Sequence, residues 1–256
     1  MWTLITGAGS GIGRALALEL ASRGHNLILA GRTASRLEEV AAAIQRDSPA
    51  SDVMIEPVDL ADPASTRALA RRVMATARQL STFVYCAGVG EPAADFASME
   101  FADFQQALAV NVSAPMLLTQ SLLPVFTGGT EASRIVMVGA GMDKHVQPGT
   151  GSYGISKMAL RRLVEQLAVE FEGMENGPLV SLFQPGLVDT PGIRTHTQSA
   201  ANMKLPHADY LRQRLDSGKC LTAGQAALAL ALSLTRVSDR DFHGSVFKAS
   251  DLLDSQ

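Results

Sequence analysis

The sequence predicts an α/β fold in which a doubly wound sheet of about seven parallel strands carries helices on both faces. Short apolar runs alternate with longer stretches of helical periodicity along the chain, which is typical of strand–helix–strand units. The runs are apolar on both faces, as parallel strands buried between helices are. Aromatic residues make up only 5% of the chain, which favours helices packed closely on a sheet. Right-handed crossovers between parallel strands then lead to the doubly wound order.

The expected elements follow from these two periodicities. Strands are expected at residues 2–6, 26–30, 53–57, 82–85, 134–138, 178–183 and 245–248. Helices are expected at residues 14–22, 34–45, 63–79, 101–125, 153–172 and 223–235. Asp62 and Pro63 mark one helix start, as an N-cap followed by proline at the first helical position. Residues 192–218 lack clear periodicity and are expected to form an irregular lid over the substrate.

Composition and charge exclude several classes of protein. The 256 residues, 46% of them hydrophobic, predict a single domain, residues 1–256, with a sizeable core. A net charge of −3 without a basic stripe favours neither a nucleic-acid nor a membrane partner, and the apolar runs are short for a membrane span. Without a secretory signal pattern, and with only Cys86 and Cys220 as cysteines, we expect a cytoplasmic protein without disulfides. The five histidines form no HxxxH pair, so no metal site is expected.

A glycine-rich turn connects the first expected strand to the first helix. Gly7, Gly11 and Gly13 give the spacing GxxxGxG, and Ile12 stands where the common GxGxxG fingerprint has its last glycine. Glycines let backbone N–H groups approach a pyrophosphate, and Ser10 and Ile12 lie where the helix begins and offers unpaired donors. Such a turn alone is also an ordinary strand-to-helix connection. Its place between a strand and a helix predicts a dinucleotide site on a Rossmann-type sheet.

The end of the second strand predicts which dinucleotide is bound. NAD-selective sites place Asp or Glu there to bind the ribose 2′-OH, whereas this chain has Ala30. Arg32 follows, and a guanidinium is suited to bind the 2′-phosphate of NADP(H) in a bidentate manner. An ordinary solvated loop arginine is the alternative interpretation. Asp59, at the end of the third strand, is placed either to reach the adenine edge or to cap a turn.

The helix expected from residue 153 carries a candidate acid/base pair. Tyr153 and Lys157 are four residues apart, so they lie on one face of that helix. A nearby ammonium stabilises the phenolate and lowers the pKa of a tyrosine, which makes it a usable acid or base for a carbonyl or an alcohol. The YxxxK pattern is common on helices, and it becomes specific only together with the dinucleotide turn.

Together these motifs resemble the short-chain dehydrogenase/reductase family from end to end. The matching pieces are residues 6–13, Asp59, residues 86–88, Asn111, residues 153–157, and Pro185 and Gly186 with Thr190. The resemblance implies an NADP(H)-dependent oxidoreductase in which Tyr153 is the general acid/base. It also implies that Lys157 holds the nicotinamide ribose and lowers the pKa of Tyr153, and that Asn111 holds a water of the proton relay.

The same resemblance implies further cofactor contacts. Ala87 and Gly88 stand in the family's turn beside the adenosine ribose, where Cys86 replaces an asparagine and is interpreted as a packed residue. On the carboxamide side of the nicotinamide, contacts are implied for Pro185, Gly186, Val188 and Thr190. The family also implies a homodimer or a homotetramer.

One departure from the family pattern concerns catalysis. The family has a catalytic serine thirteen residues before the tyrosine, and this chain has Ala140 there. Losing a polarising donor of this kind costs about 3 kcal/mol in the transition state. The loop residues Asp143, Lys144 and His145 are near enough in the chain to reach the pocket. The alternative function is therefore an NADP(H)-binding sensor or partner protein with weakened catalysis.

The C-terminal third is similar to one branch of the family. Residues 210–221 and 227–245 resemble sepiapterin reductases and bacterial benzil reductases. Lys248 stands where sepiapterin reductases hold the pterin with an acid, so a ketone or dicarbonyl is the expected substrate class, or the matching alcohol in the reverse direction. The sequence does not specify the individual substrate. His145, His196 and His207 are interpreted as surface loop histidines.

Overall fold

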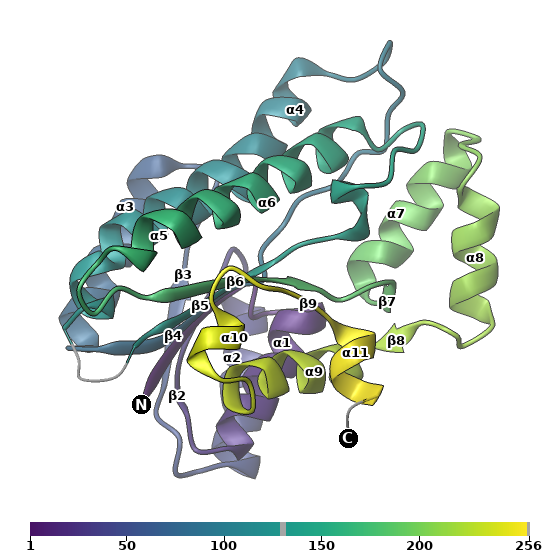
Figure 1. Cartoon of the computed structure of the whole chain (residues 1–256). Helices are drawn as coiled ribbons and strands as arrows, with labels where there is room; N and C mark the ends of the chain where they lie inside the picture. Colours follow the sequence, from purple (N-terminus) through teal and green to yellow (C-terminus); the bar gives the residue numbers. More distant parts are fainter. Residues whose placement is uncertain (129–131, 255–256) are drawn as a thin grey trace.

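The computed structural model describes residues 1–128 and 132–254, and a seven-stranded sheet runs through its centre (Figure 1). The strand order is β3-β2-β1-β4-β5-β6-β9, and each neighbouring pair is parallel. The predicted Rossmann-type α/β fold is confirmed. The strands are β1 (Trp2–Thr6), β2 (Asn26–Gly31), β3 (Val53–Pro57), β4 (Leu80–Tyr85), β5 (Arg134–Val138), β6 (Leu179–Gln184) and β9 (Val246–Lys248).

Helices cover both faces of the sheet (Figure 1). On one face lie α3 (Pro63–Thr76), α4 (Phe101–Leu108), α5 (Ala114–Phe126) and α6 (Gly151–Glu172). On the other face lie α1 (Gly11–Ser22), α2 (Ala34–Asp47), α9 (Ala223–Thr235), α10 (Asp239–Phe242) and α11 (Ala249–Asp254). Each face has its own apolar core. Leu4 of β1 belongs to one core and Ile5 to the other, and both are fully buried, which explains why the strands read as apolar on both sides.

The strand registers bring the carboxyl ends of the central strands to one edge of the sheet. Thr6 of β1 lies beside Ala30 of β2 and beside Tyr85 of β4. The dinucleotide turn and the segment that begins at Cys86 therefore leave the sheet at the same edge. The strand order reverses between β1 and β4, and sheets of this class bind ligands at that point.

The helix expected at residues 101–125 is a longer and less regular run. Between α4 and α5 lies a π-helical segment, η1 (Ala109–Ser113), which contains the candidate residue Asn111. Such segments are rare and often occur at functional sites. By length and composition alone the whole run, Phe101–Phe126, could span a membrane, with a mean hydropathy of 1.4 over its most apolar window. Half of that window is buried in this fold, and core helices of water-soluble proteins pass the same test.

The region predicted to be an irregular lid is helical, so that part of the prediction is wrong. It contains α7 (Pro191–Asn202) and α8 (Ala208–Asp216), which extend beyond the carboxyl ends of the strands (Figure 1). The hydroxyl of Thr190 caps α7 by accepting the N–H of Ile193 at 3.3 Å, and Pro191 occupies the first turn. The short strands β7 (Val188–Asp189) and β8 (Leu221–Thr222), on either side of these two helices in the sequence, pair with each other, and the role of the region as a substrate lid stays a prediction.

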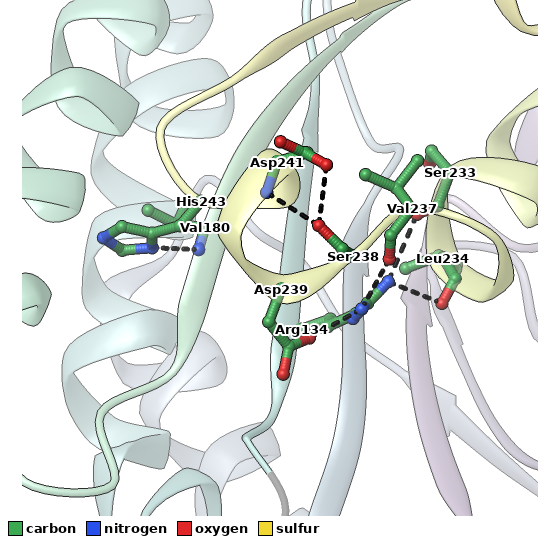
Figure 2. Close-up of polar contacts among 9 residues, drawn as sticks. All are labelled: Arg134, Val180, Ser233, Leu234, Val237, Ser238, Asp239, Asp241 and His243. Carbon is green, nitrogen blue, oxygen red and sulfur yellow. Dashed lines mark hydrogen bonds and ion pairs between the residues drawn. The ribbon is translucent and has the colours of Figure 1, made fainter.

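Arg134, the first residue of β5, joins the sheet to the end of α9 (Figure 2). Its guanidinium contacts the ring of Phe242 at 4.7 Å from the ring centroid and forms an ion pair of 2.6 Å with Asp239. It also donates hydrogen bonds of 2.8–3.3 Å to main-chain oxygens of Ser233, Leu234 and Val237. Carbonyl groups at the C-terminal end of a helix lack hydrogen-bond donors within the helix. Here the Arg134 guanidinium supplies donors to several of them.

Candidate active site

The dinucleotide turn has the geometry of an anion-binding loop. Gly7 and Gly11 have φ values of +67° and +52°, which favour glycine. A Cβ on Gly13 would lie 2.4 Å from the carbonyl oxygen of Gly7, so no side chain fits there. Ser10 is the N-cap of α1 without a side-chain cap bond, and the first turn contains no acidic residue. Ile12 lies in that turn, whose N–H groups are left for a pyrophosphate, and the loop fits the group it is predicted to bind.

A pocket lies beside the ends of β2 and β3. It is lined by Arg32, Pro57, Val58, Asp59 and Ser65. Ala30 is fully buried, and Arg32 is exposed and forms no ion pair among the described residues. Asp59 accepts the N–H of Ala61 at 2.9 Å, so it caps a turn while it also lines the pocket. Both alternatives for Asp59 therefore remain compatible with its position.

Asn111 is fully buried and its side-chain amide is held on three sides. Its Nδ2 donates to the carbonyl oxygen of Val89 at 2.7 Å and to the hydroxyl of Ser156 at 2.8 Å, while its Oδ1 accepts the N–H of Val89 at 2.9 Å. Ser156 in turn donates to the carbonyl oxygen of Tyr153 at 2.8 Å. The amide thus joins the π-helical segment η1 to the N-terminal part of α6.

Tyr153 and Lys157 lie together on α6, which begins at Gly151. The Lys157 Nζ atom is 5.6 Å from the centroid of the Tyr153 ring and donates to the carbonyl oxygen of Val138 at 2.9 Å. Burial lowers the pKa of Lys157 to about 8 and raises the pKa of Tyr153 to about 12. Burial is the cause of the Tyr153 shift, and the expectation that Lys157 lowers the pKa of Tyr153 stays a prediction.

Ala140 lies next to the end of β5, in extended backbone that caps a short 3-10 turn, η2 (Gly141–Asp143). The Asp143 carboxylate is held by side chains of α6 and β6. Its side chain is fully buried, and Oδ2 accepts from Arg161 of α6 and from Gln184 of β6, each at 2.8 Å. Lys144 and His145 are solvent-exposed. Oδ1 of Asp143 is buried without a partner among the described residues, and the group that replaces the missing serine hydroxyl stays a prediction.

The segment after β6 returns to the dinucleotide turn. Pro185 and Val188 are buried, and Gly186 has a φ of +72°. Thr190 lies beside Gly11, since a Cβ built on Gly11 would be 3.3 Å from its methyl group. The structure thus brings together the two ends of the predicted cofactor site, which are far apart in the sequence.

The segment after β4 forms a third part of the predicted cofactor site, beside the glycine turn and the segment after β6. The N–H of Ala87 donates to the Thr6 hydroxyl at 3.3 Å, and a Cβ on Gly88 would lie 3.5 Å from Lys157 Nζ. Burial raises the pKa of the Cys86 thiol to about 12, although the charge of Lys157 opposes this. Such a thiol stays protonated at neutral pH, in agreement with its interpretation as a packed residue.

Two histidines that were interpreted as surface residues are not at the surface. His207 is buried and His196 is half-buried, and their imidazole rings stack with centroids 5.3 Å apart. Sequence periodicity could not reveal this, because His196 lies on α7 and His207 immediately precedes α8. In residues 1–128 and 132–254, no three His, Cys, Asp or Glu side chains are grouped so that they could hold a metal ion.

Comparisons with known proteins agree with this geometry. A family profile described as short chain dehydrogenase matches residues 1–201. The chain belongs to the short-chain dehydrogenase family. It is 32% identical over 203 residues to polyprenol dehydrogenase of Mus musculus, and 32% identical over 239 residues to dehydrogenase/reductase SDR family member 13 of Bos taurus. These matches cover 73% and 88% of this chain but 59% and 61% of the relatives, so the chain spans about three fifths of their length.

Solved structures of short-chain dehydrogenases share the fold over nearly the whole chain. A short chain dehydrogenase from Burkholderia cenocepacia, solved in complex with NADP, is 26% identical, with a TM-score of 0.80. The match covers 96% of this chain and 94% of that one. The family predicted from the sequence motifs, the short-chain dehydrogenases, is confirmed.

Proposed function

We propose that this short-chain dehydrogenase reduces a ketone or dicarbonyl with NADP(H), and that Tyr153 donates the proton. The observation that carries the proposal is the convergence of three separate segments on one sheet edge. The glycine turn after β1, Gly88 after β4, and Tyr153 with Lys157 on α6 all lie there, with Lys157 Nζ within 3.5 Å of the Cβ position of Gly88. A binding protein needs the first two of these features but has no use for a phenol beside them.

NADP(H) is preferred over NAD(H) in this proposal. Ala30 cannot bind the ribose 2′-OH as an acid would, and Arg32 is exposed beside the pocket with its guanidinium unpaired among the described residues. Arginine binds phosphate in a bidentate manner. The complex of the B. cenocepacia relative with NADP agrees with this choice.

The pKa of Tyr153 favours the reductive direction. Reduction consumes the phenol as an acid, and oxidation requires the phenolate as a base. Because burial raises the pKa to about 12, the phenol is protonated at neutral pH and is ready to donate. NADPH, when bound at this site, would supply the hydride for the carbonyl carbon. The Tyr153 hydroxyl would give its proton to the carbonyl oxygen. The phenolate then regains a proton from water.

Lys157 and Asn111 have separate tasks. Below pH about 8 the Lys157 side chain is an ammonium, held at the end of β5 where it can donate to the nicotinamide ribose. The hydrogens of the Asn111 amide are both used, by Val89 and Ser156. A relay water on Asn111 must therefore donate to Oδ1 or bind the main chain. Its side chain fixes the π-helical segment against the turn that carries Tyr153.

The alternative function remains an NADP(H)-binding sensor with weakened catalysis, and Ala140 is the observation that favours it. No hydroxyl stands at that position, and Asp143 is committed to Arg161 and Gln184. A dicarbonyl substrate offers one solution, since its second oxygen can help polarise the reacting carbonyl. The branch likeness to sepiapterin and benzil reductases, the homodimer or homotetramer, and the cytoplasmic location stay predictions.

Two measurements separate the enzyme from the sensor. NADPH and NADH affinities are determined by fluorescence titration, and NADPH oxidation is followed with aromatic ketones, diketones and pterins. The enzyme predicts tighter NADPH binding together with oxidation in the presence of at least one diketone or activated ketone. Tight NADPH binding without oxidation by any carbonyl of the panel supports the sensor instead.

A further inference from the structure

Three ionisable side chains form a continuous hydrogen-bonded chain between the lid and the loop after β4. The Glu91 carboxylate accepts from Nδ1 of His196 at 2.5 Å, and Nε2 of His196 lies 3.2 Å from Nε2 of His207. Glu91 belongs to the loop, His196 to α7, and His207 immediately precedes α8. The near-parallel rings meet at their Nε2 atoms, with an interplanar angle of 15°.

The position of each hydrogen in the neutral pair follows from this order. Glu91 accepts, so His196 must carry a hydrogen on Nδ1 and leave Nε2 as an acceptor. The contact of 3.2 Å then requires a hydrogen on Nε2 of His207. A neutral His207 therefore has a bare Nδ1, and that atom is buried without a hydrogen-bond partner in the described structure. Protonation of His207 at Nδ1 would therefore bury an N–H donor without an acceptor.

The chain of side chains holds two packed surfaces together. Ala93 of the loop packs with Ala200, Leu205 and Ala208 of the lid in a small apolar cluster. Next to Glu91, the backbone of Gly90 supports the catalytic candidate, because a Cβ on Gly90 would lie 2.9 Å from the Tyr153 ring. The segment that backs Tyr153 is therefore the segment to which the lid is fastened.

We propose that Glu91, His196 and His207 form a latch that keeps the α7–α8 lid closed while the histidine pair carries no more than one excess proton. One excess proton keeps the contact: His196 becomes an imidazolium against the Glu91 carboxylate, and its Nε2–H donates to Nε2 of His207. His207 then carries its hydrogen on the buried Nδ1, which is the cost of this first proton. A second proton places N–H groups on both Nε2 atoms. Two cationic donors then face each other at 3.2 Å, and the contact is lost.

Other charged groups do not offset this effect. The elements around the two histidines are the loop after β4, the loop before α6, α7 and the segment up to α8. Among their described residues, Glu91 is the only titratable side chain that forms a buried or half-buried pair with His196 or His207. The exposed titratable side chains of this region are Asp95, Glu100, Lys144, His145, Arg194, Lys204, Asp209, Tyr210, Arg212 and Asp216. Arg214 is half-buried and donates to the Lys219 carbonyl, Asp143 is paired with Arg161, and Tyr153 stays a neutral phenol.

The pKa shifts have the direction that the latch requires. Burial, with a smaller contribution from His196, lowers the pKa of His207. Burial alone would raise the pKa of Glu91, but the hydrogen bond and charge of His196, together with hydrogen bonds from Ser199 and the Ala93 main chain, hold that pKa below its usual range. Groups with lowered pKa values stabilise the closed form above their unfolded pKa, and this stabilisation is lost as the pH falls. Acid therefore opens the lid.

Hydrogen–deuterium exchange on the full chain tests the latch independently of any activity. Protection factors, corrected for intrinsic exchange, are compared between about pH 7.5 and about pH 5.5. We expect peptides of α7 and α8 to lose protection at least about tenfold at the lower pH, while α9 is unchanged. Equal protection of the lid at both pH values overturns the proposal.

Three variants identify the groups responsible. His207→Leu keeps the buried volume filled and leaves His196 with Glu91, so lid protection no longer falls with acid. Glu91→Gln keeps an oxygen acceptor but removes the anion that accommodates the first proton, so the loss of protection moves to higher pH. His145→Leu, an exposed loop control, keeps the wild-type profile. A wild-type profile in His207→Leu, or no upward shift in Glu91→Gln, contradicts the latch.

Discussion

Lys157 and Val138 are joined by a hydrogen bond of 2.9 Å, in which the Nζ atom donates to the main-chain oxygen. Val138 is the last residue of β5, so this bond fixes the amino group at the carboxyl end of a central strand. The same position buries Lys157 almost completely and lowers its pKa to about 8. Burying the Lys157 ammonium, which is proposed to bind the cofactor, therefore lowers the free energy of unfolding.

That cost predicts an unusual pH dependence of stability. The folded pKa of about 8 lies below the value of about 10.4 for a free lysine, so the unfolded chain binds more protons between these values. Wild-type stability therefore gains a rising component from about pH 8 to about pH 10. Lys157→Met lacks this rising component. The free energy of unfolding of the variant minus that of the wild type is therefore largest near pH 7 and decreases toward about pH 10. Urea denaturation across this range measures the difference, and parallel profiles for the two proteins contradict the account.

The same lysine substitution weakens the cofactor. Lys157→Met removes the donor to the nicotinamide ribose, and we expect NADPH affinity to fall by about tenfold, the equivalent of one charge-assisted hydrogen bond. Fluorescence titration measures this in the variant whose stability has been determined. Unchanged NADPH affinity would exclude Lys157 from the cofactor site.

Ala140→Ser restores the hydroxyl that other short-chain dehydrogenases use to polarise the substrate. A preorganised donor of this type contributes about 10²–10³ in rate. We expect kcat on an activated ketone to rise at least about tenfold, less than the full amount because the surroundings are not adapted to the hydroxyl. NADPH affinity should hardly change. An unchanged kcat shows that another group already fills the role.

Arg32→Ala tests the choice of dinucleotide. Loss of the guanidinium should weaken NADPH binding by about tenfold or more and leave NADH binding nearly unchanged, because only NADPH carries the 2′-phosphate. Arg71→Ala, at an exposed arginine of α3, is the matched control. Equal affinities of the wild type for both cofactors are incompatible with the proposed preference.

Arg134→Met tests the connection between β5 and α9. The change leaves carbonyl groups at the helix end without their donor and removes the ion pair with Asp239. We expect a loss of about 2–4 kcal/mol in the free energy of unfolding. Arg240→Met, at an exposed arginine of α10, should stay within about 0.5 kcal/mol of the wild type. Similar losses in the two variants would rule out a specific role for Arg134.

Local sequence patterns predicted the parts of this protein that depend on neighbouring residues. The strands follow from apolar runs, the dinucleotide turn from glycine spacing, and the common face of Tyr153 and Lys157 from helical geometry. The lid helix α7 also carried a local signal that was missed, since Thr190 and Pro191 form an N-cap followed by proline. The polar composition of the lid concealed its periodicity.

Contacts between distant segments could not be predicted in this way. Arg161 meets Asp143 across 18 positions, and His196 meets Glu91 across 105. The pKa of Tyr153 depends on burial by the loop after β4, which spacing on one helix does not reveal. The sequence therefore predicts which residues share the site, whereas the structure determines their protonation and their partners.

The most direct test of the proposed chemistry is single-turnover oxidation of bound NADPH by the best diketone or activated ketone, followed by stopped-flow absorbance in the wild type and in Tyr153→Phe. The phenylalanine keeps the packing of the ring against Gly90 and removes only the proton donor. The account predicts equal NADPH affinity and a rate at least about 10² lower in the variant. Retention of most of the wild-type rate would contradict the assignment of Tyr153 as the proton donor.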